Sequence, residues 1–415
     1  CGRIAGLLLG TKPKNLESLM IQKVGIGSRP KTSQALIFRA VLYLVIGFSS
    51  SFRVFGFQTP NSISSGGGPL YSIERRQAIS TISTIPTAVL ALKMSSSPSS
   101  SVGFIGLGIM GEGMAARLIT EGVAGTESTP LIIWNRTKSK SEAFKSKFAD
   151  KSIVIKDTAK EVIAESGVTY SMLSTPEASK MVFDGEDGVL AGVGEGKSIV
   201  DCATLAEADM VRMDEAVRGK GGRFLEAPVS GSKGPAANGS LIFLCAGSDA
   251  LFNETKDNGL KAMGKASHFF ETKVGFGTRA KLVVNSLMGT MLAAFGEGLA
   301  LSEGMGLDPK TMIEVIGQGA IQSPMYNLKG PKMVVGNHAP NFPLKHAHKD
   351  MALACAMAKE AGVEYSVMDK AEELFRGARE DKDLNVADED FSAVFEKIHK
   401  ESTSEFSNKR KRDEL

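Results

Sequence analysis

The chain has 415 residues, of which 42% are hydrophobic and 23% charged, and its formal net charge is +3. This composition is that of a folded protein, and the length allows about two domains, each with its own core. The excess positive charge lies in residues 1–93, which hold eleven basic and two acidic side chains, so the remainder is acidic on balance. An acidic body argues against nucleic acid as the main partner, because phosphate binding needs a basic face.

Residues 1–93 are rich in serine and glycine and show no sustained periodicity. Their one apolar run, residues 35–48, is shorter than the roughly 20 residues that a membrane span needs, but it suits a targeting segment. We therefore expect a cleaved presequence or disordered leader, and no stable membrane insertion of the mature protein. The expected compartment is the mitochondrion or the plastid, with the cytoplasm as an alternative. The charged tail, residues 401–415, ends in Arg-Asp-Glu-Leu, which resembles a retrieval signal and would indicate the ER lumen if it is read.

A glycine-rich turn follows a short apolar strand that begins at residue 102. The stretch VGFIGLGIMGEGMA has the G-x-G-x-x-G spacing, and a helical pattern comes after it. The first glycine permits a tight turn, the second lets a pyrophosphate approach the backbone, and the third lets helix and strand pack closely. The helix N-terminus then offers unpaired N–H groups to the phosphates. The residues expected to hold the cofactor here are Gly106, Leu107, Gly108, Ile109, Met110 and Gly111.

Strand-like segments recur beyond this turn, and helical stretches separate most of them. They are residues 131–134, 168–173, 198–203, 223–229 and 240–246. Alternation of this kind is typical of an α/β protein with a parallel sheet. We therefore predict a Rossmann-type nucleotide-binding domain over residues 101–273.

The end of the second strand predicts which cofactor binds. An acid usually stands there, where it hydrogen-bonds the ribose 2′-hydroxyl of NAD and would repel a 2′-phosphate. This chain has Asn135, Arg136 and Thr137 instead. Arg136 can form charge-assisted hydrogen bonds with a 2′-phosphate, and its two neighbours add neutral donors. The alternative is that Arg136 is an ordinary solvated loop residue. The sequence thus predicts NADPH as the cofactor, with NADH weaker.

The character of the chain changes after residue 273, and we predict an all-helical domain over residues 274–400. Residues 280–307 are apolar around nearly the whole circumference of a helix, which is typical of a buried helix. Lys281 and Asn285 share one face, and Gly289 leaves room on it for an approaching group. Burial lowers the pKa of a lysine, which suits a proton donor. The equal alternative is a lysine that reaches out to water from the first turn.

Metal ligands do not occur in a recognisable pattern. The four cysteines, Cys1, Cys202, Cys245 and Cys355, form no C-x-x-C pair and are expected to be small buried side chains. His346 and His348 have no visible third ligand near them. We therefore predict no metal site.

Four stretches resemble the β-hydroxyacid dehydrogenase family, which includes the 3-hydroxyisobutyrate dehydrogenases. They are GFIGLGIMGEGMA, APVSGSKGPAANGSL, KLVVNSLMG and FPLKHAHKDMALA, in the order and spacing of the family over about residues 101–400. Within the family, WNRT, PVSGSK and the stretch around GAIQSPM look most like the plant-type glyoxylate/succinic semialdehyde reductases. The resemblance implies an α/β N-terminal Rossmann domain, a long interdomain helix and an all-α C-terminal domain for catalysis and dimerisation. It also implies a homodimer or homotetramer.

The resemblance further implies roles for single residues. Lys281 matches the catalytic lysine of the family, and Asn285 matches its partner. The residues that match the substrate site are Ser230, Gly231, Ser232, Phe342 and Asp350. Those that match the cofactor site, beyond the glycine turn and the end of the second strand, are Leu173, Ser174, Thr204 and Lys349.

The implied function is NADPH-dependent reduction of small aldehyde acids, namely glyoxylate to glycolate and succinic semialdehyde to 4-hydroxybutyrate. The nicotinamide supplies the hydride, residues 230–232 hold the substrate carboxylate, and Lys281 delivers the proton to the forming alkoxide. One alternative is NAD-dependent oxidation of 3-hydroxyisobutyrate or another 3-hydroxy acid, and Arg136 argues against it. A less favoured alternative is a non-catalytic binding module, against which the presence of Lys281 argues.

Overall fold

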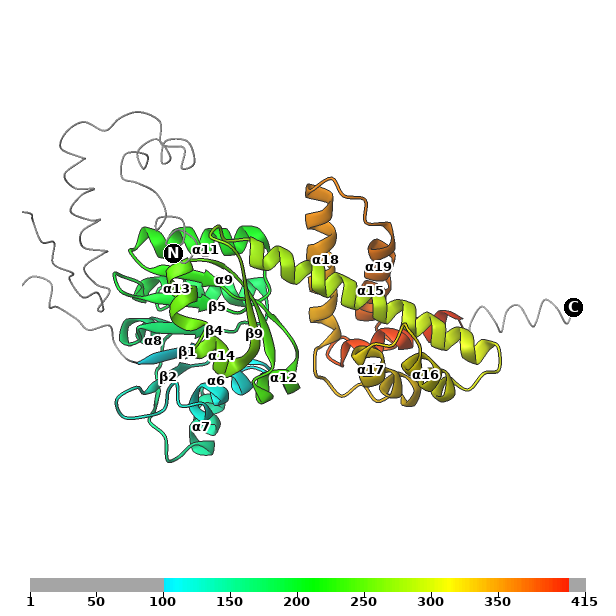
Figure 1. Cartoon of the computed structure of the whole chain (residues 1–415), viewed down its shortest axis with the longest axis horizontal. Coiled ribbons are helices and arrows are strands. Elements are labelled where there is room, and N and C mark those ends of the chain that lie inside the picture. Colours follow the sequence, from blue (N-terminus) through cyan, green and yellow to red (C-terminus); the bar gives the residue numbers. More distant parts are fainter. Residues whose placement is uncertain (1–100, 403–415) are drawn as a thin grey trace, which may run out of the picture. The chain divides into compact units, whose positions relative to one another are not determined.

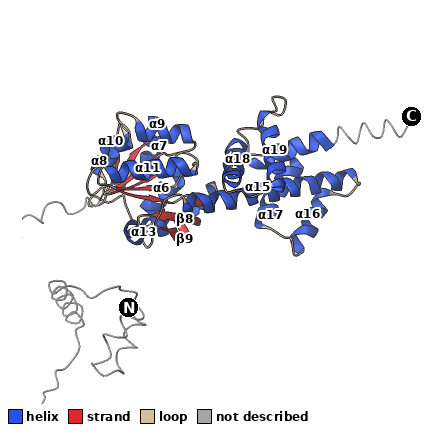
Figure 2. Ribbon diagram, turned by 90° about the horizontal axis from the view of Figure 1, so that it is seen from above, coloured by secondary structure: helices blue, strands red, loops and turns tan. Residues whose placement is uncertain are grey.

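The computed structural model describes residues 101–402 of the chain (Figure 1). The leader predicted for residues 1–93, and all but the first two residues of the predicted tail, lie outside this range. The described residues form a mostly parallel sheet between helices, followed by a group of helices that begins with one long helix (Figure 2). The predicted fold class, a Rossmann domain with an all-helical second part, is confirmed.

Six strands of the sheet run parallel in the order β3-β2-β1-β4-β5-β6. This is the strand order of dinucleotide-binding folds, in which the order reverses between the first and fourth strands. Ligands bind outside the carboxyl ends of the strands at that reversal. The six strands are β1 Val102–Ile105, β2 Leu131–Trp134, β3 Ile153–Ile155, β4 Val168–Ser171, β5 Ser198–Asp201 and β6 Arg223–Glu226.

Three further strands extend the sheet beyond β6. They are β7 Val229–Ser230, β8 Leu241–Gly247 and β9 Gly264–Glu271, and β8 runs antiparallel to β6 and β7 but parallel to β9. The single strand predicted over residues 223–229 is divided in the structure, because Pro228 has no N–H for a sheet ladder. The sequence pattern did not indicate β3, which has three residues, or β9, whose residues after Gly264 are exposed or half-buried.

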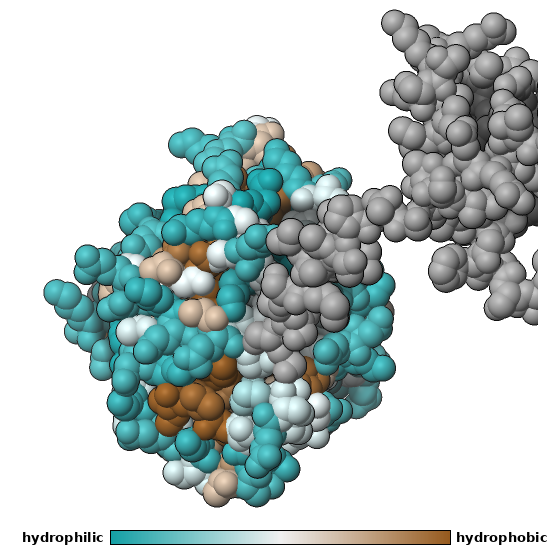
Figure 3. Space-filling view, turned by 90° about the vertical axis from the view of Figure 1, so that its left-hand side faces the viewer, coloured by the Kyte–Doolittle hydropathy of each residue, from teal (hydrophilic) through white to brown (hydrophobic). Residues whose placement is uncertain are grey.

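Helices cover both faces of the sheet and bury a separate core on each. Phe104 and Ile105 are neighbours in β1, point to opposite faces and belong to different buried clusters. Phe104 packs with Met114 and Leu118 of α6, whereas Ile105 packs with Val162 of α8. The helices of this half are α6 Gly111–Thr120, α7 Lys138–Lys147, α8 Ala159–Glu165, α9 Pro176–Asp184, α10 Val189–Gly192, α11 Glu207–Gly219, α12 Lys233–Asn238, α13 Asp249–Thr255 and α14 Gly259–Met263. Figure 3 shows one face of this half, which is mostly hydrophilic with small hydrophobic patches.

The helical half is built around the long helix α15. Its core joins Leu292, Phe295 and Leu299 of α15 to Phe375 of α19 and to Phe395 near the end of the described chain. Helices α18 and α19 pack along α15 and against each other. The elements of this half are α15 Phe276–Gly304, α16 Pro309–Gln318, α17 Pro324–Val335, α18 Leu344–Glu360, α19 Ser366–Glu380 and the 3-10 helix η2 Phe391–Ala393.

The first turn of α15 is fixed to the sheet by Glu226, the fully buried last residue of β6. Its carboxylate accepts hydrogen bonds from Gly275 N at 2.6 Å, Gly277 N at 2.8 Å and Thr278 Oγ1 at 2.8 Å. An acid at this place satisfies N–H groups that a helix leaves unpaired at its N-terminus. Burial raises the pKa of the Glu226 carboxyl, and the same hydrogen bonds oppose that rise. These hydrogen bonds to Glu226 therefore fix the position of Lys281, one turn further along α15, relative to the sheet.

The expectation that α15 is buried around its whole circumference is wrong. Val284, Leu287 and Leu301 are exposed, whereas Leu292 and Leu299 on the other side are buried. Apolar residues on every face left the two sides indistinguishable in the sequence. By length and composition α15 could also cross a membrane, but half of its apolar window is buried in the protein, as in an ordinary core helix.

Candidate active site

The glycine turn between β1 and α6 has the geometry of a phosphate-binding loop. Gly106 adopts a φ of +95°, and a Cβ on it would lie 2.4 Å from the Met172 carbonyl oxygen. A Cβ on Gly111 would lie 1.9 Å from the Gly106 carbonyl oxygen. Only glycine fits at these two positions. No side chain in the described range caps the N-terminus of α6, so its N–H groups suit an anionic ligand such as a dinucleotide phosphate.

A cavity of about 270 Å³ opens beside this turn. Its walls come from the glycine turn, the chain after β4, the chain after β5, and the segment around the start of α18. Among the predicted residues, Leu173, Ser174, Thr204, Phe342, Lys349 and Asp350 line it together with Gly108, Ile109, Met110 and Gly111. The structure therefore brings predicted cofactor and substrate residues to one cavity at the reversal point of the sheet.

A second cavity, of about 170 Å³, lies at the end of β2 and shares Gly108 and Leu173 with the first. Arg136 and Thr137 line it, and the Arg136 side chain is exposed. Asn135 also lines it, but much of its amide is already used. Asn135 Oδ1 accepts a hydrogen bond from Leu107 N at 2.9 Å, and Nδ2 donates to Thr137 O at 2.9 Å. Asn135 thus braces the glycine turn against the end of β2.

Lys281 lies at one end of a buried chain of three polar side chains. Its Nζ donates to Asn285 Oδ1 at 2.9 Å, and Asn285 Nδ2 donates to Asp350 Oδ2 at 2.6 Å. The three side chains are 6%, 3% and 2% exposed. Asp350 lines the larger cavity, whereas Lys281 and Asn285 line neither of the two cavities, so the chain of side chains leads from the larger cavity to a buried lysine on α15. Of the two alternatives for Lys281, the buried lysine is confirmed and the water-reaching lysine is wrong.

The environment of Lys281 alters its acidity. Burial lowers the pKa of its ammonium group to about 8, the negative charge of Asp350 opposes this shift, and the positive charge of Lys349 adds to it. A group with a pKa in this range exchanges its proton at physiological pH. Lys281 therefore has the acidity that a proton donor needs.

Lys349 joins the helical half to the sheet. Its Nζ donates a hydrogen bond to the Thr204 carbonyl oxygen and forms an ion pair with Asp350 Oδ1 at 2.8 Å. Apart from this ion pair, Asp350 Oδ1 has no hydrogen-bond partner among the described residues.

The loop of residues 230–232 does not line either of the two cavities described above. Ser230 belongs to β7 and pairs with Ile242, Gly231 has a φ of +136°, and α12 begins directly after Ser232. The short strand β7 lies close to α15, which carries Lys281. The room expected beside Gly289 is filled by α18, because a Cβ there would lie 2.3 Å from Met351 Sδ.

Several cavity residues were not predicted. Lys140 of α7 lines both cavities, and Met172, Asn341 and His346 line the larger one. Lys140 lies in the first turn of α7, just after the end of β2, and its position in the chain close to Arg136 was the available signal for it. Burial and the charge of Lys349 lower the pKa of the His346 imidazole, so His346 is neutral at pH 7.

His348, one of the histidine pair in α18, is engaged by neighbouring side chains. His348 Nε2 lies 2.8 Å from Glu372 Oε1, and Nδ1 lies 3.1 Å from Arg379 Nη1. Within residues 101–402, no group of three histidine, cysteine or acidic side chains is arranged to hold a metal ion. Cys202 and Cys245 are buried, as expected, whereas Cys355 is only partly buried.

Two family models match the described part of the chain. The NAD binding domain of 6-phosphogluconate dehydrogenase matches residues 101–275. The NAD-binding domain of NADP-dependent 3-hydroxyisobutyrate dehydrogenase matches residues 275–398.

Two curated relatives come from Arabidopsis thaliana. Glyoxylate/succinic semialdehyde reductase 2, chloroplastic, is 43% identical over 72% of this chain and 79% of its own length. Glyoxylate/succinic semialdehyde reductase 1 is 41% identical over 72% of this chain and 98% of its own. Among solved structures, a 3-hydroxyisobutyrate dehydrogenase from Salmonella typhimurium matches with a TM-score of 0.62 at 24% identity, covering 71% of this chain and 99% of that one. This last similarity shows a shared fold.

The sheet order, the glycine turn and the matching family models together define an oxidoreductase that binds a nicotinamide cofactor. With relatives above 40% identity over most of their length, the chain belongs to the β-hydroxyacid dehydrogenase family, whose enzymes act on the CH–OH groups of small hydroxy acids or the matching aldehydes.

Proposed function

We propose that the protein is an NADPH-dependent reductase of small aldehyde acids, converting glyoxylate to glycolate and succinic semialdehyde to 4-hydroxybutyrate. The observation that carries this proposal is the buried chain from Lys281 through Asn285 to Asp350, which ends at the cavity beside the glycine turn. The names of the two plant relatives support the choice of substrate.

The preference for NADPH rests on the cavity at the end of β2. Arg136 and Lys140 both line it, and no acidic side chain does. Two cations at this place attract a 2′-phosphate, and Arg136 is exposed and able to turn toward one. Asn135 holds the glycine turn in place, and Thr137 adds a hydroxyl. When bound, the cofactor supplies the hydride.

The chain's own residues account for the rest of the reaction. Lys281, protonated below a pKa of about 8, gives its proton to the oxygen of the aldehyde as negative charge develops there. Asn285 keeps the lysine in place, and Asp350 keeps Asn285 in place. From the match to the family, the backbone N–H groups and hydroxyls of residues 230–232 hold the substrate carboxylate, although this loop lines neither cavity, and Phe342, which lines the larger cavity, forms a wall of the substrate pocket.

We further propose that residues 101–273 act as the cofactor domain and residues 274–400 as the domain for catalysis and self-association. An exposed apolar side of α15, which continues to the C-cap residue Met305, supports the role in self-association. Seven exposed residues follow one another at alternating spacings of three and four, namely Val284, Leu287, Met291, Ala294, Gly298, Leu301 and Met305. This is the spacing of a helix-to-helix seam. We call these residues the α15 seam.

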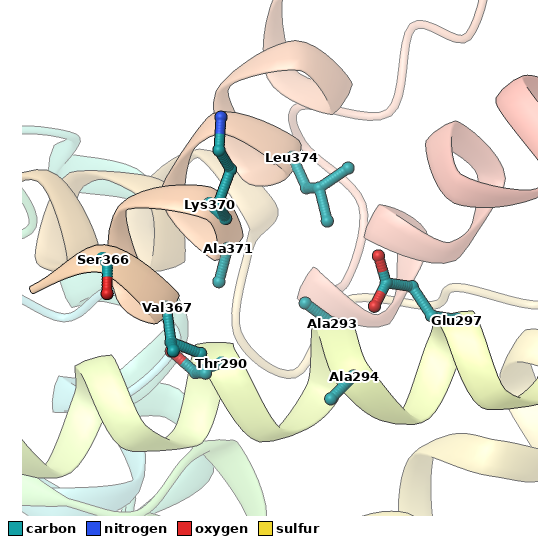
Figure 4. Close-up of a pocket in the computed structure, with 9 residues that line it drawn as sticks. All are labelled: Thr290, Ala293, Ala294, Glu297, Ser366, Val367, Lys370, Ala371 and Leu374. Carbon is teal, nitrogen blue, oxygen red and sulfur yellow. The ribbon is translucent and has the colours of Figure 1, made fainter.

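A second copy of the chain is the partner that fits the α15 seam. None of its seven residues is charged, and its centre holds the two smallest, Ala294 and Gly298, which allow two helices to approach closely. Of the large hydrophobic side chains exposed in the described residues, all but Ile109, Met181 and Phe270 lie in the helical half. A groove of about 330 Å³ between α15 and α19 runs beside the seam and includes Ala294 (Figure 4). A homodimer, or a homotetramer built from it, would cover this surface.

The compartment proposed for the protein is an organelle, either the plastid or the mitochondrion. The basic and acid-poor composition of residues 1–93 supports it, as does the word chloroplastic in the name of one relative. Fusing residues 1–93 to a fluorescent protein tests this point. Fluorescence spread through the cytosol would contradict it.

Steady-state kinetics with a panel of acids test the proposed activity. Glyoxylate and succinic semialdehyde are each assayed with NADPH and NADH, and 3-hydroxyisobutyrate is assayed with NADP⁺ and NAD⁺. We expect the highest kcat/KM for an aldehyde acid with NADPH. Faster oxidation of 3-hydroxyisobutyrate with NAD⁺ would overturn the proposal, and an absence of turnover with every pair would support a binding module.

A further inference from the structure

A buried ion pair in the helical half lies next to the loop that lines the larger cavity. Lys329 of α17 is 3% exposed, and Asp390, the residue before η2, is fully buried. Lys329 Nζ donates to both carboxylate oxygens of Asp390, at 2.7 and 2.8 Å. Two charges removed from water gain little net stability from each other, because each loses its hydration. A gain in folding stability therefore does not explain why this ion pair is buried here.

Asp390 also binds the backbone of the loop that carries the cavity wall. Its Oδ2 accepts hydrogen bonds from Asn341 N at 3.1 Å and Phe342 N at 3.2 Å. In return, Asp390 N donates to His338 O at 2.8 Å. The isolated bridge between Pro343 and Asp390 completes the connection. A carboxylate some fifty positions later in the chain thus fixes the backbone of residues 338–343.

Aromatic contacts also link the ion pair to Phe342. Lys329 Nζ lies 4.5 Å from the centre of the Phe391 ring. The Phe391 ring meets the Phe342 ring edge to face, with centroids 5.6 Å apart and an interplanar angle of 67°. Phe391 N also donates to Phe342 O at 2.9 Å. Both the backbone and the ring of Phe342 are therefore held from the side of the ion pair.

Asn341 and Phe342 line the larger cavity, together with Asp350 of the lysine chain. We propose that Asp390, with Lys329 as its counter-ion, is a positioning residue that sets the place of Phe342 in the substrate pocket. The identity of the substrate rests on the function proposed above. Among the described residues, no hydrogen bond joins Asp390 to Lys281, Asn285 or Asp350. The ion pair should therefore affect substrate binding but not proton transfer from Lys281.

The first test compares two variants of one short segment. Asp390→Asn keeps the size of the side chain but removes its charge and one acceptor oxygen. In the unmodified protein Oδ1 accepts a hydrogen bond from Ser392 N at 3.2 Å, and a single amide oxygen cannot accept from both Ser392 and the loop. We expect the KM for the acid substrate to rise roughly tenfold while kcat stays within about threefold, as for the loss of a charged hydrogen bond. Asp388→Asn is the matched control, because Asp388 is exposed and pairs with the exposed Lys345. It should change neither constant.

A second measurement separates positioning from a general effect on folding. If Asp390 acts through Phe342, then Asp390→Asn in a Phe342→Ala background should change KM by less than about twofold, because the wall that it positions is gone. An equal rise of KM in both backgrounds would overturn the proposal. So would a fall in kcat at unchanged KM.

A third variant covers the case in which Asp390→Asn does not fold because its lysine is left buried and unpaired. Lys329→Met combined with Asp390→Asn removes both charges and should restore the melting temperature, while the raised KM remains. A double variant with normal KM would overturn the proposal. All KM values are measured with the best substrate of the unmodified enzyme. If that substrate is 3-hydroxyisobutyrate, the proposed activity fails, and the comparison of variants still decides the role of Asp390.

Discussion

Lys281 and Asn285 stand one helical turn apart on α15, and the lysine Nζ donates a hydrogen bond to the amide oxygen at 2.9 Å. The amide in turn donates to Asp350, so the carboxylate is hydrogen-bonded to the lysine only through a neutral intermediary, although its negative charge still raises the pKa of the lysine. A direct lysine–carboxylate pair would hold the proton more tightly and keep the lysine charged. The interposed amide orients the ammonium group and leaves its proton available.

Replacing Lys281 with Met tests whether the lysine is the proton donor. Methionine has a similar length and no polar atom, so the fold should survive, and the cofactor contacts lie in other elements. We expect kcat for aldehyde reduction to fall roughly 10²–10⁴-fold, the usual range for general acid catalysis, with little change in NADPH affinity. Asn285→Ala should lose less, because it orients the lysine without donating the proton. A Lys281→Met variant with normal circular dichroism and near-normal kcat would rule out the lysine as the acid.

The pH dependence of the two reaction directions should be opposite. Burial lowers the pKa of Lys281 to about 8, against the opposing charge of Asp350 and with the support of Lys349. Reduction needs the protonated lysine, so its kcat/KM should fall as pH rises through about 8. Oxidation of the hydroxy acid needs the neutral lysine and should rise over the same interval. Lys281→Arg, which stays protonated, should move this inflection far upward. An inflection that is unchanged in that variant would assign it to another group.

Arg136 should decide between the two nicotinamide cofactors. In Arg136→Asp a repelling carboxylate replaces a donor to the 2′-phosphate, so the KM for NADPH should rise at least roughly tenfold while the KM for NADH changes little. Lys138→Ala is the matched control, because Lys138 is a neighbouring cation that pairs with Asp157 and does not line the cavity. Equal KM values for NADPH and NADH in the unmodified enzyme would contradict the preference.

Local patterns in the sequence were sufficient for much of this site. The glycine turn was predicted because the G-x-G-x-x-G spacing between a strand and a helix is itself a local pattern, although the contact that requires Gly106 comes from Met172 on the chain after β4. Lys281 and Asn285 were paired because their spacing alone puts them on one helical face. By contrast, Asp390 reaches Phe342 across 48 positions, and no pattern in either stretch signals the other.

Features that depend on packing between elements were also missed or misread. Gly289 was expected to leave an opening, and Met351 of α18 fills it. The helix α15 was expected to be buried throughout, because periodicity cannot separate a side that faces a core from an equally apolar side that faces outward. Strand β9 was missed because its side chains, which are exposed or half-buried, give no apolar alternation in the sequence.

The α15 seam gives the last prediction. Leu287 and Leu301 lie on opposite sides of the small residues Ala294 and Gly298 and are 48% and 58% exposed. Replacing both leucines with glutamate places charges in a surface that a second copy would bury, at a cost of several kcal/mol unless they are paired. We expect the assembly to dissociate toward monomers in sedimentation or light-scattering measurements, with the fold of each monomer preserved because neither leucine is part of the core. Val335→Glu, on an equally exposed residue of α17 outside the seam, is the control and should leave the assembly intact. A double variant that keeps the mass of the unmodified assembly would show that the copies meet elsewhere, and an unmodified chain that is already monomeric would remove the second copy as the partner of the seam.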